Sequence, residues 1–207
     1  MRLPIEEHLK HEWLVTTLAP DFELLDVWRY PIEIDRSVPF DRFVDFMQGS
    51  QRELVSSRGA AGALFRLRAI LGKLFRWDDE DGRPSAALPI PGCQETSLRD
   101  RLNDADRSPD PPPQAGSNFK PVYLRENETL LEISNNTVHA MMHLGRVPIS
   151  DSLWSPQLAV YVKPRGRFGN FYMSLISPFR HYIVYPAMMR TAKKGWLAAE
   201  KTRRLAR

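Results

Sequence analysis

The last third of the chain carries the clearest pattern of apolar and polar positions. Between Leu153 and Lys163, apolar residues at 158, 160 and 162 alternate with their neighbours, which predicts a half-buried strand. The stretch PRGR, Pro164 to Arg167, ends this strand. Large apolar side chains then recur at helical spacing, at Phe168, Phe171, Tyr172, Leu175, Phe179, Tyr182 and Ile183. We therefore expect a strand that leads into a long C-terminal helix, whose aromatic face packs on a sheet.

Three more strands are predicted immediately before this one. Residues 119–124, 129–134 and 137–146 are separated by turn-forming residues, RENE after the first and Asn135–Asn136 after the second. In the third strand, positions 138, 140, 142 and 144 share one face, and His139, Met141 and His143 share the other. Sequential strands usually lie side by side, so we expect a four-stranded antiparallel meander.

The N-terminal half predicts shorter elements. Residues 4–18 are interpreted as a helix with Leu9, Trp13 and Leu18 facing inward, and residues 27–34 as a strand that Pro31 confines to a sheet edge. Two helices follow, one entered at 37–39 and one over residues 60–77. The predicted fold class is α+β, with a curved antiparallel sheet packed on a long C-terminal helix and two shorter helices after the first strand.

Proline residues define the organisation of the chain. Residues 78–118 contain seven prolines and little apolar periodicity, so we interpret them as a surface loop inserted into a single domain of residues 1–207. Pro178 would interrupt the last helix. A continuous helix with a kink or break near Ser177 is favoured over a strand at 168–176, because the helical spacing runs across the proline.

Composition excludes several classes of protein. The single cysteine, Cys93, rules out an intrachain disulfide and multi-cysteine metal sites, and no cofactor or metal is expected. No apolar run of about 18 residues and no secretion signal is seen, which indicates a cytoplasmic protein. The net charge of +4 is concentrated in a basic tail, residues 192–207, for which we consider weak contact with acidic membranes. One aromatic residue among these charges does not predict a nucleic-acid site.

His139 and His143 are the most conspicuous chemical groups. Four residues apart on a strand, their Cα atoms lie about 13 Å apart, too far for both to bind one metal ion. They are interpreted either as two half-exposed histidines on the outer face, or as cavity residues that orient a ligand or act as a general base. The sequence contains no GxSxG, HExxH, GxGxxG or P-loop motif, so nothing specific indicates an enzyme.

Three stretches resemble an uncharacterised bacterial family of domains of unknown function. They are APDFELLDVWRYPI (19–32), LFRLRAILGKLF (64–75) and GRFGNFYMSLISPFRHYIVYPAMMR (166–190), and the last carries the pattern of Phe168, Gly169, Tyr172, Pro178, Phe179 and Arg180. Such domains occur alone or C-terminal to short-chain dehydrogenase domains, which implies enzymes of that type as partners. The resemblance also implies a START-like, helix-grip fold, in which a curved sheet wraps a long C-terminal helix around an apolar cavity.

The function that these observations favour is non-catalytic binding of a small apolar or amphipathic ligand between the sheet and the C-terminal helix. The alternatives are an enzyme that uses a histidine and a tyrosine in that cavity, and an interaction module with its basic tail on acidic membranes. The candidate ligand-binding residues are Tyr123, His139, Met141, His143, Tyr161, Tyr172, Leu175, Phe179 and Tyr182.

Overall fold

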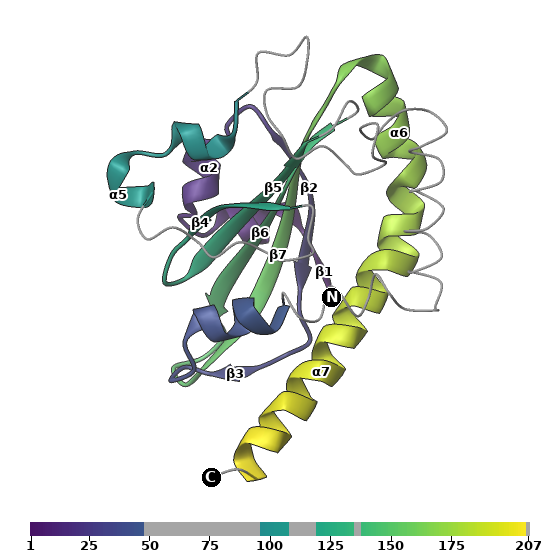
Figure 1. The fold of residues 1–207 in the computed structure, drawn as a ribbon. Helices are drawn as coiled ribbons and strands as arrows, with labels where there is room; N and C mark the ends of the chain where they lie inside the picture. The colour runs from purple at the N-terminus through teal and green to yellow at the C-terminus, as the bar shows by residue number, and fades with distance from the viewer. Residues whose placement is uncertain (48–95, 108–118, 135–137, 206–207) are drawn as a thin grey trace.

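The computed structural model describes residues 1–47, 96–107, 119–134 and 138–205, and its centre is a curved antiparallel sheet (Figure 1). The strand order is β1-β2-β7-β6-β5-β4, and β3 also pairs with β7. The strands are β1 (Arg2–Leu3), β2 (Glu23–Arg29), β3 (Ile34–Asp35), β4 (Lys120–Leu124), β5 (Glu128–Ser134), β6 (Val138–Pro148) and β7 (Leu153–Pro164). The predicted α+β class and the meander β4-β5-β6-β7 are confirmed.

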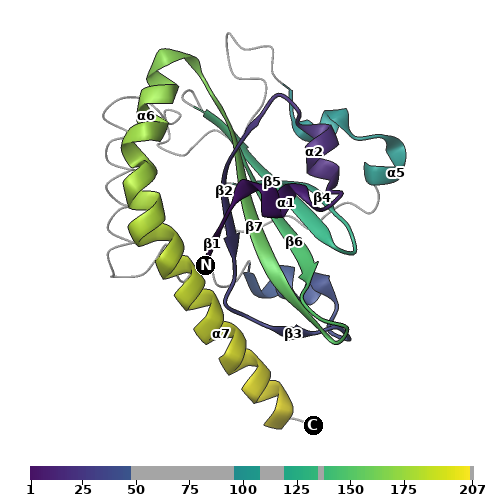
Figure 2. The same cartoon turned by 180° about the vertical axis from the view of Figure 1, so that it is seen from behind.

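Helices cover both faces of the sheet, as the two opposite views show (Figures 1 and 2). One face carries α1 (Ile5–Leu9), α2 (Leu14–Leu18) and the 3-10 turn η1 (Leu98–Arg101), which leads to α5 (Asp104–Arg107). The other face packs against helical residues 40–47 and the long C-terminal helix. We call these the N-terminal face and the helix face. Each has its own apolar cluster, with Trp13, Phe22 and Tyr161 on the first and Phe43, Trp154 and Trp196 on the second.

The C-terminal helix is continuous through Pro178, as the helical spacing predicts. It consists of α6 (Gly166–Phe179), a π-helical turn η2 (Arg180–Val184) and α7 (Tyr185–Leu205). Pro178 has no N–H to donate to the preceding turn, and such a gap is commonly absorbed by a local irregularity. The irregularity is the π turn, which begins three residues after the expected position at Ser177.

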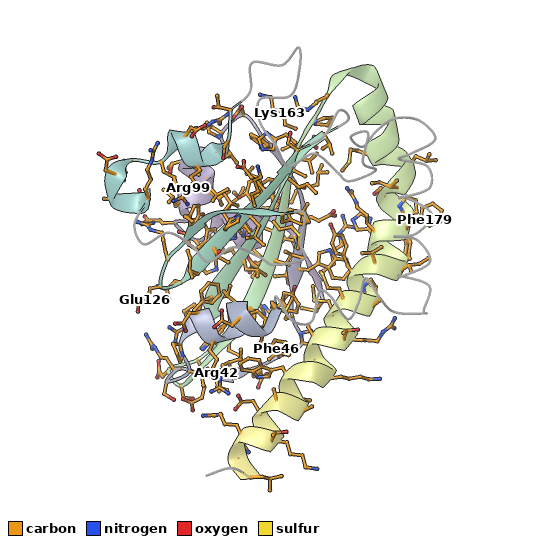
Figure 3. All side chains as sticks on the ribbon, viewed as in Figure 1. Arg42, Phe46, Arg99, Glu126, Lys163 and Phe179 are labelled. Atoms are coloured by element: carbon orange, nitrogen blue, oxygen red, sulfur yellow. The ribbon has the colours of Figure 1, made fainter. Side chains whose placement is uncertain are left out.

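The face of this helix that meets the sheet differs from the predicted one. Leu175, Phe179 and Tyr182 are 57%, 47% and 81% exposed, and Phe179 points away from the sheet (Figure 3). The buried positions are Tyr185, Met188, Met189, Ala192 and Trp196, all in α7. The apolar stripe misled the prediction because polar side chains of η2, together with Tyr185 at the start of α7, turn inward to pair with a buried aspartate. Residues 192–205, which were predicted to form a basic tail, are part of α7. Trp196 in this segment is buried in the apolar cluster of the helix face.

Several N-terminal expectations also need correction. Residues 4–18 form two short helices, in which Trp13 and Leu18 are buried as expected but Leu9 is exposed. The strand expected at 27–34 begins four residues earlier as β2, and Pro31 lies beyond its end. Residues 96–107 do not form a surface loop, because Leu98 and Leu102 pack into the N-terminal face. The helix predicted at 60–77 lies outside the described residues.

Candidate functional site

A β-bulge in β2 directs an acidic side chain into the helix face. Leu24 pairs with Tyr161 and Asp26 pairs with Val160, so Leu25 is an extra residue without a partner of its own. Such a bulge reverses the face on which the following residues lie and is frequent beside functional sites. Asp26 is consequently only 1% exposed and faces the C-terminal helix. A carboxylate buried to this degree requires charged and hydrogen-bonding partners.

Those partners all come from one and a half turns of the C-terminal helix. His181 Nε2 hydrogen-bonds Asp26 Oδ1, the hydroxyl of Tyr185 donates to Oδ2 over 3.0 Å, and Arg180 Nη2 lies 3.4 Å from Oδ2. Burial, reinforced by the charge of Asp26, raises the pKa of Tyr185 well above its ordinary value, so this hydroxyl stays protonated and donates. We call these residues, with Ser177, the Asp26 cluster.

The π turn explains how three neighbouring helical residues reach one carboxylate. An ordinary α-helix turns by about 100° per residue, which spreads residues 180, 181 and 185 around the axis. The wider turn at 180–184 brings them toward the same strand, and π turns of this kind occur frequently at functional sites. A bulge in the strand and a π turn in the helix therefore meet at Asp26.

Ser177 extends the cluster toward solvent. Its Oγ lies 3.3 Å from His181 Nδ1, one helical turn away. Because the Asp26 carboxylate can only accept, His181 Nε2 carries a proton, and in the neutral ring Nδ1 accepts from the serine hydroxyl. The order Ser177–His181–Asp26 thus provides a hydroxyl, a base and an acid that orients the base.

Apolar side chains border the cluster on the sheet. Met142 of β6 and Val160 of β7 are directly paired, and Val160 is also the partner of Asp26. Both side chains are only partly buried and lie against the apolar cluster of the helix face, as does Leu124. The Asp26 cluster therefore has polar groups on the helix and an incompletely covered apolar wall on the sheet.

The two histidines singled out in the sequence lie on the opposite face. His139 and His143 are 1% and 0% exposed, so the interpretation as half-exposed residues is wrong. His143 Nε2 contacts Glu128 Oε2 at 2.9 Å, and His139 Nε2 contacts Glu132 Oε2 at 3.1 Å. Each buried histidine is matched by a glutamate of the adjacent strand, and α1, α2 and η1 cover both pairs.

The glutamates also hold the covering segments in place. Glu128 accepts from the Leu14 N–H and the Tyr123 hydroxyl, and Glu132 accepts from the Leu98 N–H over 3.0 Å. Burial acts to raise the pKa of Glu128, but its hydrogen bonds with His143, Leu14 and Tyr123 outweigh burial and lower it. The pairs have a structural role that the sequence analysis did not anticipate, since they attach α2 and η1 to the sheet.

A third histidine, His8, lies in the same buried layer. His8 Nδ1 is 2.6 Å from Gln157 Oε1 and its Nε2 is 2.9 Å from the Tyr161 hydroxyl. Gln157 Oε1 only accepts, so Nδ1 carries the proton and Nε2 accepts from Tyr161. Burial, together with the neighbouring His143, lowers the pKa of His8 to about 3, which keeps the ring neutral.

The structure therefore separates the sequence-predicted site residues. Tyr123, His139, Met141, His143 and Tyr161 are buried on the N-terminal face, whereas Leu175, Phe179 and Tyr182 are exposed on the C-terminal helix. The side chain of Tyr172 lies outside the described part. The missed residues are Asp26 and His181. Two features of the sequence could have indicated them: an acidic residue within an otherwise apolar strand, and a histidine one helical turn after Ser177.

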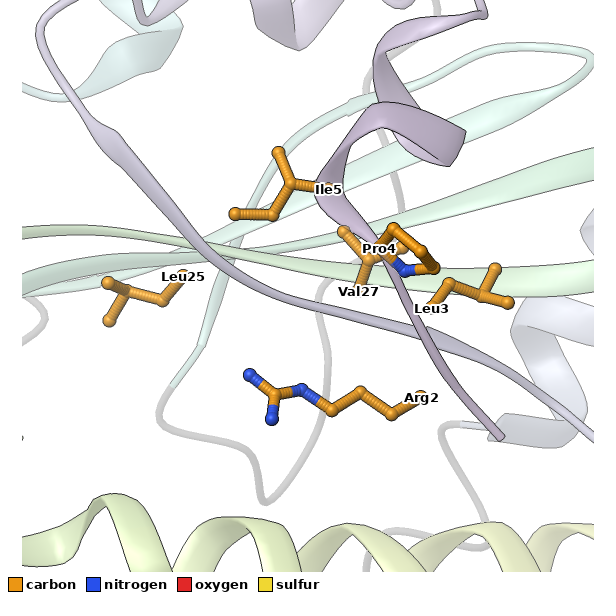
Figure 4. Close-up of a pocket in the computed structure, with 6 residues that line it drawn as sticks. All are labelled: Arg2, Leu3, Pro4, Ile5, Leu25 and Val27. Carbon is orange, nitrogen blue, oxygen red and sulfur yellow. The ribbon is translucent and has the colours of Figure 1, made fainter.

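Two hollows are lined by described residues. A shallow one of about 330 Å³ lies at the β1–β2 edge and is lined by side chains of β1, β2 and the start of α1, among them Arg2, Ile5 and Leu25 of the bulge (Figure 4). The larger one, of about 780 Å³, lies at the end of the sheet near the β4–β5 turn. Within the described ranges no three metal-ligating side chains gather, and no helix combines the length and apolar content needed to cross a membrane.

Comparison with known proteins gives a family and no more. No curated protein and no solved structure matches the chain. Residues 18–187 match a family model, and this range includes the bulge in β2, the meander and the π turn. The chain belongs to the family described as a protein of unknown function, DUF2867.

Proposed function

We propose that the protein binds a small amphipathic molecule on the helix face, at the Asp26 cluster. The observation that carries this proposal is the buried Asp26 carboxylate, which two structural irregularities bring into contact with Arg180, His181 and Tyr185. Buried charge is costly, and its concentration at one point next to partly covered apolar side chains is typical of ligand sites. The sheet-and-helix arrangement supports a START-like, helix-grip reading of the fold.

The chemistry of the cluster favours a ligand with a hydrogen-bond acceptor at one end. Arg180 and His181 are each about 16% exposed, so they can reach a ligand while they remain paired with Asp26. Arg180 Nε is a buried donor without a partner among the described residues. A carboxylate or carbonyl oxygen would satisfy this donor. The apolar part of the ligand would then lie against Met142 and Val160.

A titration with an anionic apolar fluorescent probe, anilinonaphthalene sulfonate, tests the proposal. We expect saturable binding that Arg180→Gln weakens about 10-fold, equivalent to about 1.4 kcal/mol. Arg190→Gln removes an exposed charge from the same helix and should leave the affinity unchanged. Phe179→Ala is a second control, because it would reduce binding only if the probe used the exposed outer stripe.

The result is interpretable only with folded variants. Arg180→Lys retains the charge beside Asp26 and is the alternative if Arg180→Gln unfolds, as judged by a cooperative thermal transition. Met142→Trp should block the probe by filling the apolar wall. The proposal fails if no saturable binding occurs, or if the Arg180 and Arg190 variants bind the probe equally well.

A second candidate function is hydrolysis of an ester, favoured by the chain Ser177–His181–Asp26. Ser177 Oγ would attack the carbonyl carbon as His181 Nδ1 takes its proton, and the alcohol would leave with that proton. Water would then release the acid and restore the serine. Labelling by an alkyl fluorophosphonate that is absent in Ser177→Ala and Asp26→Asn would support this function. Equal labelling of Ser177→Ala would refute it.

A further inference from the structure

We propose a second site: the pocket at the end of the sheet binds an organic anion with a flat apolar body. This pocket has a volume of about 780 Å³ and lies between the α1–α2 connection and the β4–β5 and β6–β7 turns. It shares no lining residue with the Asp26 cluster, so the two sites are independent. Its principal lining residues are His11, Trp13, Arg36, Arg125, Arg146 and Trp154.

Two of its three arginines have uncompensated charge. Arg146 Nη2 donates to the carbonyl of Arg36 over 2.6 Å, and Arg36 Nη1 donates to the carbonyl of Asp151 over 3.3 Å. In residues 1–47, 96–107, 119–134 and 138–205, neither guanidinium forms an ion pair with a carboxylate. A guanidinium carries five donors, so both retain donors that suit a carboxylate or a phosphate.

The charge of the third arginine, Arg125, is balanced by carboxylates of the protein itself. Arg125 Nη2 lies 2.9 Å from Asp106 Oδ1, and its Nη1 lies 3.6 Å from Glu128 Oε1. Its charge is matched within the fold, so it contributes shape to the pocket and little net attraction for an anion. The anion is therefore expected at Arg36 and Arg146, which their shared hydrogen bond holds next to each other.

Two tryptophan rings that line the pocket favour a ligand with a flat apolar body. The guanidinium of Arg146 lies over the Trp154 ring, 5.1 Å from its centroid, and Trp154 Nε1 donates to the Asp35 carbonyl over 3.2 Å. These contacts fix the orientation of Arg146 before a ligand arrives, which reduces the entropy cost of binding. Trp13 lines the same pocket. An aryl phosphate or an aryl carboxylate combines the two features.

Acidic residues at the rim provide an internal control. Glu126 and Glu12 line the pocket and are exposed, and Glu126 lies at the edge of the molecule in Figure 3. Their carboxylates would repel an anion, although solvent and salt screen exposed charges strongly. Removing one of them should therefore tighten the binding of an anion, whereas it would weaken the binding of a cation.

Calorimetric titration of the full chain with phenyl phosphate, benzoate and inorganic phosphate at low ionic strength tests the proposal. We expect saturable binding of phenyl phosphate or benzoate, about 10-fold weaker in Arg146→Gln and in Arg36→Gln. Binding should be a few-fold tighter in Glu126→Gln. Lys120→Gln removes one positive charge at the opposite end of β4 and should have no effect.

The three probes separate the head group from the aromatic body. Stronger binding of phenyl phosphate than of benzoate identifies phosphate as the preferred head group, and the reverse identifies carboxylate. Inorganic phosphate should bind more weakly than phenyl phosphate, and equal affinity would contradict the role of the aromatic rings. The proposal is overturned if none of the probes binds saturably, or if Lys120→Gln weakens binding as much as Arg36→Gln. Arg36 is exposed, so its variant keeps the test valid should Arg146→Gln fail to fold.

Discussion

Gly145 and Trp13 approach each other so closely that no larger residue fits at position 145. A Cβ atom on Gly145 would lie 2.7 Å from Cη2 of Trp13 and 3.2 Å from Cε1 of His143. Trp13 stands between α1 and α2, and its Nε1 donates to the His8 carbonyl over 3.1 Å. The absence of a side chain on β6 thus allows the indole to cover the buried histidines.

We therefore expect Gly145→Ala to destabilise the protein by about 1–3 kcal/mol, as overpacking of a rigid core usually does. Urea denaturation of the wild type and the variant measures this difference. Trp13→Phe, which shortens the ring system, should remove most of the penalty in the double variant. Additive effects of the two substitutions would show that the close approach is not what constrains position 145.

Stability should decline as the pH falls from 6.5 toward 3, because His8 is held neutral. The folded-state pKa of His8 is about 3 and the ordinary value is 6.5, so the unfolded chain binds more protons in this range. The free energy of unfolding therefore has its full value above pH 6.5. Below pH 6.5 it decreases by up to about 1.4 kcal/mol per pH unit. Burial lowers the pKa of His143 as well, which acts in the same direction.

Denaturant unfolding at a series of pH values checks this expectation. His8→Gln replaces the ring by a group that does not titrate, so its stability should depend less steeply on pH between 6 and 4.5. Above pH 7 the two proteins should respond to pH alike, which serves as the control. Identical slopes below pH 6 would mean that His8 becomes protonated without unfolding.

The meander could be predicted from sequence because alternation persists through β6, where side chains at 142 and 144 contribute to the helix face. The pairing of the histidines could also have been found. Glu128 and Glu132 are four residues apart, as are His139 and His143, and the predicted strands that carry them are neighbours, which β5 and β6 prove to be. The histidines were interpreted as half-exposed residues or as ligand or base residues in a cavity, and their pairing with the two glutamates was not among these interpretations.

The Asp26 cluster could not be predicted in the same way. Simple alternation through β2 assigns Leu24 and Asp26 to one face, and only the bulge at Leu25 separates them. The aromatic stripe of the C-terminal helix was equally misleading. Periodicity shows where the apolar residues of a helix lie, but it does not show that polar residues of the helix must face the sheet to pair with a buried carboxylate. Both errors have one physical cause, the requirement that Asp26 be paired once it is buried.

Leu98 should prove essential to stability although it lies in the segment that the sequence presents as a loop. The side chain is fully buried on the N-terminal face, and the Leu98 N–H donates to Glu132. Leu98→Ala should cost about 2–5 kcal/mol, the usual range for a buried leucine. Asp104→Ala, in the neighbouring exposed helix α5, is the matched control and should change the unfolding free energy little.

The same contacts predict the effect of a deletion. Replacing residues 79–117 by a short Gly/Ser linker should lower the melting temperature markedly, because it removes Leu98 and Leu102 from the core and leaves Glu132 without its hydrogen bonds from Ser97 and Leu98. A segment that was only a surface loop, as interpreted from the sequence, would tolerate this deletion. An unchanged melting temperature would show that η1 contributes nothing to the N-terminal face.

The exposed face of α7 should bind anionic membranes only weakly and only at low salt. Its exposed cations are Arg190, Lys193, Lys194, Lys201 and Arg204. Each basic residue close to an anionic surface contributes about 1 kcal/mol, and this attraction decreases within a Debye length. An aromatic anchor would strengthen binding, but Trp196 is buried against Phe43 and Phe46 and is not available to lipid.

Co-sedimentation with vesicles that contain phosphatidylserine measures this binding. A chain that ends at Thr191 would be a poor comparison, because it lacks Trp196 and would lose core packing as well as charge. Replacement of Lys193, Lys194 and Lys201 by glutamate leaves the buried face of α7 intact and should abolish pelleting at low salt. Pelleting that persists above about 0.15 M salt, or on neutral vesicles, would contradict an electrostatic contact and would require the exposed Leu197 and Leu205 to insert into the bilayer.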